Sequence, residues 1–245
     1  MMDLKLKGKK VVITGGSKGI GEAIVHTMIQ EGAEVFFCAR QSENVNQILN
    51  TYSEISHQIH GSALDVTNQE AFSAWLQEIG HFDVFIPNVS ALSGSWDDSL
   101  EIDLKSTIHC IEAVIPWLNQ SQTPAITYIG SKASSFATPG FESYGAVKAA
   151  MTHYMKSLAA GLVSKSIRVN VVSPGDTFVE NGFWDNIRKN HPDVYDATIA
   201  ANPMGRLCTP QEVASAVAFI SSPKASFISG TNLIIDGCST NHIHI

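Results

Sequence analysis

The chain has 245 residues, of which 44% are hydrophobic. A chain of this size can bury one sizeable core, and we expect a single domain over residues 1–245. Its 16 Lys and Arg residues are outnumbered by 23 Asp and Glu residues, so the surface lacks the basic field that attracts nucleic acids and anionic membranes. The expected partners are therefore a small-molecule substrate and further copies of the chain.

Cysteine and histidine usage indicates a cytoplasmic protein without a metal site. The cysteines lie far apart, which fits reduced thiols better than disulfides or zinc ligands; they are Cys38, Cys110, Cys208 and Cys238. The apolar run at 11–13 is too short for a signal-peptide core or a membrane span. Several histidines lack the neighbouring carboxylates or cysteines that a metal site needs; they are His109, His153, His242 and His244.

Seven short apolar runs alternate with helical stretches along the chain. We expect strands that end at Thr14, Arg40, Val66, Asn88, Gly130, Ser173 and Asp236. Most of these runs are continuously apolar, as strands are when helices cover both faces of a parallel sheet. The pattern predicts an α/β chain with a doubly wound Rossmann fold and a seven-stranded parallel sheet.

Two segments have the sequence of a helix N-terminal capping box. They are Thr67-Asn68-Gln69-Glu70 and Thr209-Pro210-Gln211-Glu212. In such a box the Thr hydroxyl and the Glu carboxylate each satisfy a backbone N–H group that has no partner in the helix. We therefore expect Thr67 and Thr209 to be N-caps of helices.

The longest stretch without a clear strand runs from about 176 to 204. It contains four aromatic residues, Phe178, Phe183, Trp184 and Tyr195. Ligands of doubly wound folds bind at the carboxyl ends of the strands, so an aromatic insertion after the sixth strand is a candidate lid over the substrate. The alternative is a surface helix pair that packs on its own aromatic side chains.

A glycine-rich segment directly follows the first strand and precedes a helical run. Its sequence is Thr14-Gly15-Gly16-Ser17-Lys18-Gly19-Ile20-Gly21. Glycines at such a turn let the backbone amides of the helix N-terminus reach a pyrophosphate. Because the segment lies between the first strand and the first helix, it predicts a dinucleotide site.

The end of the second strand bears on the choice of cofactor. A NAD site of this type usually has an Asp or Glu there, whereas an Arg can receive a 2′-phosphate. The strand ends at Arg40, and Lys18 in the glycine loop adds a second positive charge. We therefore predict NADP(H) in preference to NAD(H), with both side chains clamping the phosphate. The alternative is that Arg40 is a solvated strand-end residue.

Tyr144 and Lys148 lie four residues apart in a predicted helix and share one face of it. A nearby ammonium stabilises a phenolate, which suits a tyrosine to proton exchange near neutral pH. Ser131 follows the fifth strand, where its hydroxyl can hydrogen-bond a reacting oxygen. These three residues are the candidate catalytic groups.

These motifs occur in an order that resembles the short-chain dehydrogenase/reductase family over nearly the whole chain, in particular its 3-oxoacyl-acyl-carrier-protein reductase-like members. The matching pieces are the glycine loop at 14–21, Asp65 with Val66, Asn88, Ser131, Tyr144, Lys148, the loop at 173–177 and the closing segment at 230–237. The resemblance implies hydride transfer between a nicotinamide and a carbonyl or alcohol substrate. It also implies a homo-oligomer, either a tetramer or a dimer.

The resemblance assigns a role to each matching residue. Tyr144 exchanges a proton with the substrate oxygen, Ser131 orients that oxygen, and Lys148 holds the nicotinamide ribose while tuning Tyr144. Cofactor contacts are implied for the glycine loop and for a further set of residues. That set is Asp65 and Val66 at the adenine, Asn88 along the cofactor, and Pro174, Gly175 and Thr177 at the nicotinamide end.

The chain departs from the family pattern at two places. After the fourth strand it has Pro87-Asn88-Val89-Ser90 in place of Asn-Asn-Ala-Gly. In the helix expected from 96 to 117, Asp103 replaces an asparagine thought to hold a water of the proton relay, and because its carboxylate oxygens could still hold that water, Asp103 is a fourth candidate catalytic residue. An ionised carboxylate near Lys148 would compete with the tyrosinate for that ammonium. The departures suggest an alternative, a dinucleotide-binding sensor or scaffold with lost or weak catalysis, whereas the retained catalytic residues favour an enzyme.

Overall fold

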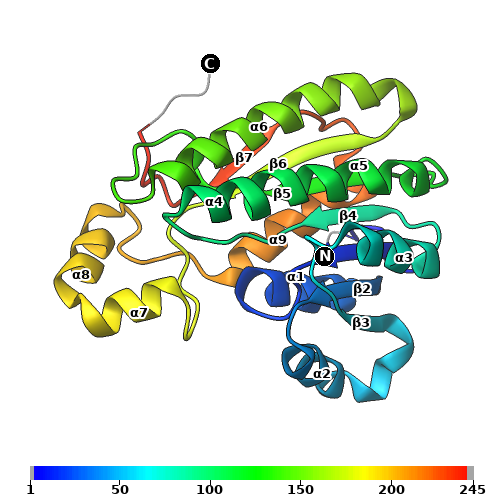
Figure 1. Cartoon of the computed structure of the whole chain (residues 1–245), viewed down its shortest axis with the longest axis horizontal. Helices are drawn as coiled ribbons and strands as arrows, with labels where there is room; N and C mark the ends of the chain where they lie inside the picture. Colours follow the sequence, from blue (N-terminus) through cyan, green and yellow to red (C-terminus); the bar gives the residue numbers. More distant parts are fainter. Residues whose placement is uncertain (1–2, 242–245) are drawn as a thin grey trace.

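The computed structural model describes residues 3–241, and at its centre is one seven-stranded sheet with the order β3-β2-β1-β4-β5-β6-β7 (Figure 1). Every neighbouring pair of strands is parallel, which confirms the predicted doubly wound Rossmann fold. The strands are β1 (Lys10–Thr14), β2 (Glu34–Ala39), β3 (Ile59–Ala63), β4 (Val84–Pro87), β5 (Ala125–Ile129), β6 (Arg168–Pro174) and β7 (Asn232–Ile235). His242 and His244 lie outside the described residues.

The predicted strand ends agree with the structure to within one residue, except for the third strand. We expected it to reach Val66, but β3 ends at Ala63. The reason is that β2, to which β3 is hydrogen-bonded, itself ends at Ala39. Leu64 donates a last hydrogen bond to the Ala39 carbonyl, and the chain then turns at Asp65.

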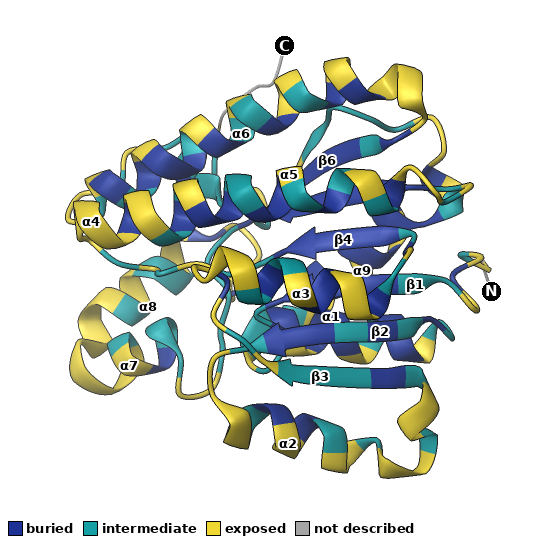
Figure 2. Cartoon of the chain, turned by 45° about the vertical axis from the view of Figure 1, so that its right-hand side comes forward, coloured by how far each residue is buried: buried dark blue, intermediate teal, exposed yellow. Residues whose placement is uncertain are grey.

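Helices cover both faces of the sheet (Figure 2). One face carries α1 (Gly19–Gln30), α2 (Ser42–Thr51) and α9 (Pro210–Ser221), and the other carries α3 (Gln69–Ile79), α5 (Thr107–Leu118) and α6 (Glu142–Leu162). Successive strand residues point to opposite faces, so each face has its own group of buried apolar side chains. In β5, for example, Ile126 and Tyr128 pack with the α3, α5 and α6 layer, whereas Ala125 and Ile129 pack with the α1 and α9 layer.

The helix expected from 96 to 117 is divided into three parts. They are α4 (Trp96–Asp98), a π-helical segment η2 (Ser99–Ser106) and α5. The Ser106 and Thr107 hydroxyls donate hydrogen bonds to the carbonyls of Glu101 and Ile102, five residues earlier, at 2.7 Å and 3.1 Å. These bonds follow the wider winding of η2, and such π-helical turns are frequent at functional sites.

Of the two predicted capping boxes, the second is confirmed and the first is wrong. Thr209 accepts a hydrogen bond from Glu212 N, and the Glu212 carboxylate accepts one from Thr209 N at 2.8 Å. At the start of α3 the N-cap is Asn68, which accepts from Ala71 N at 3.0 Å. The Thr67 hydroxyl instead donates to Asp65 at 2.9 Å, so a competing local acceptor removes it from the helix end.

The segment after β6 lies apart from the helix layers. It contains α7 (Phe183–Asn190) and α8 (Pro192–Ala201), which Figure 1 shows beside the sheet at one end of the molecule. Asp185 is buried in α7, and no residue of α8 is buried. Short 3₁₀ turns complete the structure at Ser53–Gln58, Lys132–Ser134, Val163–Lys165 and Pro223–Ala225. Over residues 3–241 no helix combines the length and the apolar character needed to cross a membrane.

The strand order reverses between β1 and β4, which are neighbours although β2 and β3 lie between them in the chain. Connections from these two strands leave the sheet on opposite sides, so a crevice opens at their carboxyl ends. Gly15 directly follows β1, and Asn88 directly follows β4. The topology therefore brings the predicted cofactor residues to one edge of the sheet.

Candidate active site

The glycine loop presents the start of α1 to the crevice. Lys18 is the N-cap of this helix, and its side chain makes no capping hydrogen bond. Gly21 lies so close to the turn that an added Cβ would be 2.0 Å from the Gly15 carbonyl oxygen. The close packing, with no side-chain cap on the helix, makes this end of α1 suitable for a phosphate group.

Predicted cofactor residues from separate loops line one cavity of about 540 Å³ beside this helix end. They are Gly15, Ser17, Lys18, Ile20, Arg40, Asp65, Val66, Asn88, Tyr144 and Lys148. Two other predicted residues, Thr14 and Gly21, are buried behind the lining. The Thr14 hydroxyl accepts a hydrogen bond from Asn88 N at 3.2 Å, so Thr14 holds the β4 loop in place. The residues present thus fit an extended dinucleotide.

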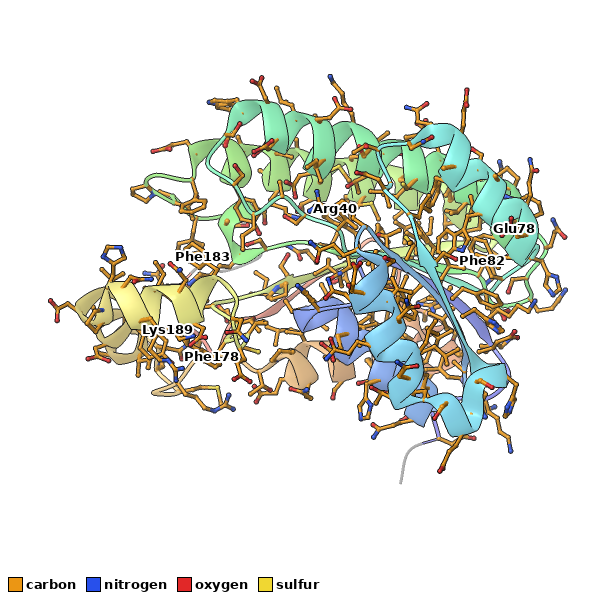
Figure 3. All side chains as sticks on the ribbon, turned by 60° about the horizontal axis from the view of Figure 1, so that its bottom comes forward. Arg40, Glu78, Phe82, Phe178, Phe183 and Lys189 are labelled. Atoms are coloured by element: carbon orange, nitrogen blue, oxygen red, sulfur yellow. The ribbon has the colours of Figure 1, made fainter. Side chains whose placement is uncertain are left out.

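Arg40 and Lys18 both line this cavity and are exposed. Figure 3 shows Arg40 near the middle of the molecule, between the helix layers. The acidic residue on this side, Asp65, accepts hydrogen bonds from Thr67 N and the Thr67 hydroxyl at 3.0 Å and 2.9 Å. Neither Arg40 nor Lys18 has a carboxylate partner among the ion pairs of residues 3–241. Both cations are therefore available to an anionic ligand.

A second, larger cleft of about 2080 Å³ adjoins the cavity and shares Ser17, Lys18, Ile20 and Tyr144 with it. The cleft is also lined by Gly19 of the glycine loop, by the candidate catalytic Ser131, and by Pro174, Gly175 and Thr177, the residues expected at the nicotinamide end. Residues of α7 and α8 close its far side, among them Phe183, Trp184 and Val194. The structure thus brings Tyr144 to the junction between the cavity and the cleft.

Close packing sets the position of Ser131 relative to Tyr144. The turn Lys132–Ser134, which follows Ser131, packs against α6. Gly145 permits this approach, because a Cβ there would lie 2.8 Å from the Thr138 hydroxyl and 3.3 Å from the Ala133 carbonyl oxygen. The Ser131 hydroxyl accepts a hydrogen bond from Ala133 N at 3.1 Å, which leaves its proton free to point into the cleft.

Lys148 lies behind Tyr144, with its side chain only 2% exposed. Its Nζ atom is 5.5 Å from the centre of the Tyr144 ring. The ammonium forms an ion pair with Asp103 at 3.3 Å and donates a hydrogen bond to the Tyr128 hydroxyl at 3.0 Å. Burial opposes the charge, but the nearby Tyr128, Tyr144 and Asp103 outweigh it and raise the pKa of Lys148 above its ordinary value. The amine is therefore protonated at neutral pH.

Asp103 connects this ammonium with the unusual loop after β4. One carboxylate oxygen faces Lys148, and the other accepts a hydrogen bond from Ala91 N at 3.1 Å. The carboxylate is fully buried and lines neither cavity. The expected closeness of Asp103 and Lys148 is thus confirmed. The sequence did not point to Tyr128, because a tyrosine within an apolar strand is typical of an ordinary core residue.

The segment proposed as a lid is organised around aromatic side chains and one acid. Phe183 makes edge contacts with Phe141 and Trp184, with ring centres 5.5 Å and 5.4 Å apart. Asp185 forms ion pairs with Arg188 at 2.6 Å and Lys189 at 2.7 Å. In Figure 3, Phe178, Phe183 and Lys189 lie together at the end of the molecule opposite Glu78 and Phe82.

The base of this segment is joined by backbone hydrogen bonds. Phe178 N donates to the Cys208 carbonyl at 2.9 Å, and Cys208 N donates to the Asp176 carbonyl at 2.8 Å. The segment is therefore anchored at both ends beside the loop at 173–177. Within the part of the chain that the structure describes, no group of three or more His, Cys, Asp or Glu side chains is arranged to hold a metal ion.

Comparison with known proteins places the chain among enzymes. A family model described as enoyl-(acyl carrier protein) reductase matches residues 15–240. The chain is 34% identical over 246 residues to isoepoxydon dehydrogenase of Penicillium expansum, with 95% of each chain covered. It is 33% identical over 247 residues to 3-oxoacyl-(acyl-carrier-protein) reductase of Vibrio cholerae, which covers 96% of this chain and 98% of that one.

A solved structure gives the same result. It is a short-chain oxidoreductase from Pseudomonas aeruginosa, described as NADPH-bound and as containing an atypical catalytic center. The two folds superpose with a TM-score of 0.85 at 25% sequence identity, covering 96% of this chain and 98% of that one. The fold is thus shared over almost the full length.

Proposed function

Because the chain belongs to the short-chain dehydrogenase/reductase family, whose members are oxidoreductases of CH–OH and C=O groups, we propose that it uses NADP(H) to interconvert a carbonyl and an alcohol. The observation that carries the proposal is the position of Tyr144 where the two cavities meet. Lys148 lies behind the Tyr144 ring, and Ser131 lines the same cleft. A proton donor and a hydroxyl thus line one cleft, and a cation lies 5.5 Å from the centre of the phenol ring.

In the proposed reaction, bound NADPH supplies the hydride that the carbonyl carbon accepts. The Ser131 hydroxyl donates a hydrogen bond to the carbonyl oxygen and so polarises the bond. The Tyr144 hydroxyl then gives its proton to that oxygen, which completes the alcohol. The buried Lys148 ammonium stabilises the phenolate that remains until a proton from solvent restores it. Alcohol oxidation runs through the same groups in reverse.

The preference for NADP(H) rests on Arg40 and Lys18. Both are exposed at the dinucleotide cavity, and no acid stands at the end of β2. A 2′-phosphate can accept charge-assisted hydrogen bonds from both side chains, whereas a free ribose hydroxyl gains little from them. Calorimetric titration with each cofactor tests this preference: we expect NADPH to bind more tightly than NADH, and equal affinities would contradict it.

We further propose that α7 and α8 form a lid over a partly apolar ketone, aldehyde or 3-oxoacyl thioester. Aromatic residues of this segment line the cleft, and relatives are named for an isoepoxydon and for 3-oxoacyl chains. A panel of these carbonyl compounds, followed by NADPH absorbance, identifies the class. Consumption of NADPH with at least one of them is expected. Tight NADPH binding without turnover on any of these compounds would instead favour the alternative of a dinucleotide-binding sensor. The observation that supports this alternative is the buried ion pair between Asp103 and Lys148.

We also propose a cytoplasmic homo-oligomer, either a tetramer or a dimer. The cysteines of the chain are all free, and two of them, Cys38 and Cys110, are buried. Large apolar side chains are exposed in and around α9 and β7; they are Phe219, Phe227 and Leu233. A second copy could cover them. Light scattering after gel filtration gives the mass directly, and a monomer at micromolar concentration would contradict the proposal.

A further inference from the structure

Tyr128 reaches the catalytic lysine from the interior of the protein. It is fully buried in β5 and points toward the α6 side of the sheet. Its hydroxyl accepts a hydrogen bond from Lys148 Nζ at 3.0 Å. Burial raises the pKa of the Tyr128 phenol, although Lys148 acts in the opposite direction, so this phenol is neutral at physiological pH. Tyr128 lines neither cavity, so any role in the reaction must act through Lys148.

Three oxygen atoms of the protein lie close to the Lys148 ammonium, which has three N–H groups. The ammonium donates hydrogen bonds to the Tyr128 hydroxyl at 3.0 Å and the Ile129 carbonyl oxygen at 3.4 Å, and it forms an ion pair without a hydrogen bond with an Asp103 carboxylate oxygen at 3.3 Å. Two of these oxygen atoms belong to β5 and one belongs to η2. The position of the ammonium is therefore a balance between the attractions of these two elements.

We infer that Tyr128 is a positioning residue for the proposed reaction, because its hydroxyl holds the Lys148 ammonium against the pull of Asp103. This inference rests on the proposed function. Without that hydroxyl, the strongest remaining partner is the Asp103 carboxylate, since a bond between two charged groups is stronger than one to a neutral carbonyl. The ammonium then moves toward η2 and stabilises the Tyr144 phenolate less.

The substitution Tyr128→Phe keeps the ring and removes only the hydroxyl. We expect kcat to fall about tenfold and the substrate KM to change little. In alcohol oxidation, the midpoint of the pH–rate profile should rise by about one unit, because the phenolate is less stabilised. The titratable groups that face the ammonium are Tyr128, Tyr144 and Asp103. Adding Asp103→Asn to the Tyr128→Phe variant should therefore return the midpoint toward that of the parent protein.

Thr127→Val provides a matched control from the same strand. It also removes a buried hydroxyl, but Thr127 points to the opposite face and shares a hydrogen bond with Ser221 at 2.8 Å. This variant should lose stability and keep the pH–rate profile of the parent. A shift of similar size in both variants would show a general packing effect and would overturn the inference.

Cofactor affinity gives a readout that does not depend on turnover. If Lys148 holds the nicotinamide ribose, displacement of the ammonium in Tyr128→Phe should weaken NADPH binding by about fivefold in calorimetry, with Thr127→Val unchanged. Unchanged affinity together with an unchanged pH–rate profile would refute the role of Tyr128. Failure of the parent protein to turn over any carbonyl compound would refute the proposed function instead, and the affinity measurement would still test Tyr128.

Discussion

Two carboxylates of this protein hold cations in opposite surroundings. Asp103 is fully buried and faces a lysine that is only 2% exposed, at the centre of the proposed catalytic site. Asp185 is equally buried, but its partners Arg188 and Lys189 are 50% and 57% exposed, and they lie within four residues of it. The first pair joins distant elements, so it is part of the core and of the proposed catalytic site. The second group of ion pairs stabilises one short helix through local contacts, so substitutions in the proposed lid should not lower the stability of the sheet.

The largest effect that separates the two regions should come from Tyr144→Phe. Loss of the proton donor should reduce turnover by about 10²- to 10⁴-fold, the usual contribution of a general acid or base. NADPH binding should stay largely intact, which calorimetry can check. The matched control is Tyr195→Phe in α8, which removes a hydroxyl from the lid and should keep most of the activity. Near-normal turnover in Tyr144→Phe would remove this residue from the mechanism.

Next in size is the effect of Lys148→Met on stability. The substitution leaves the Asp103 carboxylate buried without its cation, which should lower the free energy of unfolding by about 3–5 kcal/mol. Chemical denaturation measures the loss. Adding Asp103→Asn should recover part of it, because an amide oxygen can still accept the hydrogen bond from Ala91 N without carrying a charge. If the double variant is no more stable than Lys148→Met alone, the buried pair is not the source of the loss.

Arg40→Gln should change the preference between NADPH and NADH without altering the structure around Asp103 or the proposed lid around Asp185. We expect the NADPH dissociation constant to rise about tenfold or more and that of NADH to change little, since a charge-assisted bond to phosphate contributes about 1.5–3 kcal/mol. Lys9→Gln removes one positive charge at the opposite edge of the sheet, where Lys9 pairs with Asp83, and serves as the control. Equal weakening of both cofactors in Arg40→Gln would argue against a 2′-phosphate contact.

The smallest effect is expected from Asp185→Asn in the lid. The hydrogen bond from Lys189, followed by those from Asn181 N and Arg188, lowers the pKa of Asp185 to about 2. A lowered pKa stabilises the folded lid above the ordinary value of 3.8 and loses that contribution as the pH falls toward 2. The local structure around α7 should thus stay folded through the physiological range, and Asp185→Asn should raise the substrate KM a few-fold with kcat nearly unchanged. A fall in kcat as large as that of Tyr144→Phe would contradict the separation of lid from chemistry.

Local spacing made much of the site predictable from sequence. The glycine loop, Arg40 and Asn88 each follow a strand, and parallel strands bring their carboxyl ends to one edge. Tyr144 and Lys148 required only one helix. The contact between Tyr128 and Lys148 was not predictable, because it depends on how β5 packs against α6 across 20 residues of sequence. Asp65 likewise took the Thr67 hydroxyl away from the predicted cap, a competition that a capping motif does not reveal.

The central claim is that Tyr144, Ser131 and Lys148 surround the reacting end of a bound dinucleotide. A crystal structure of the NADPH complex tests it most directly. We predict the pyrophosphate at the start of α1, the 2′-phosphate against Arg40 and Lys18, and the nicotinamide ring in the cleft beside Tyr144 and Ser131. A nicotinamide directed away from Tyr144, or a cofactor bound outside these two cavities, would contradict the account.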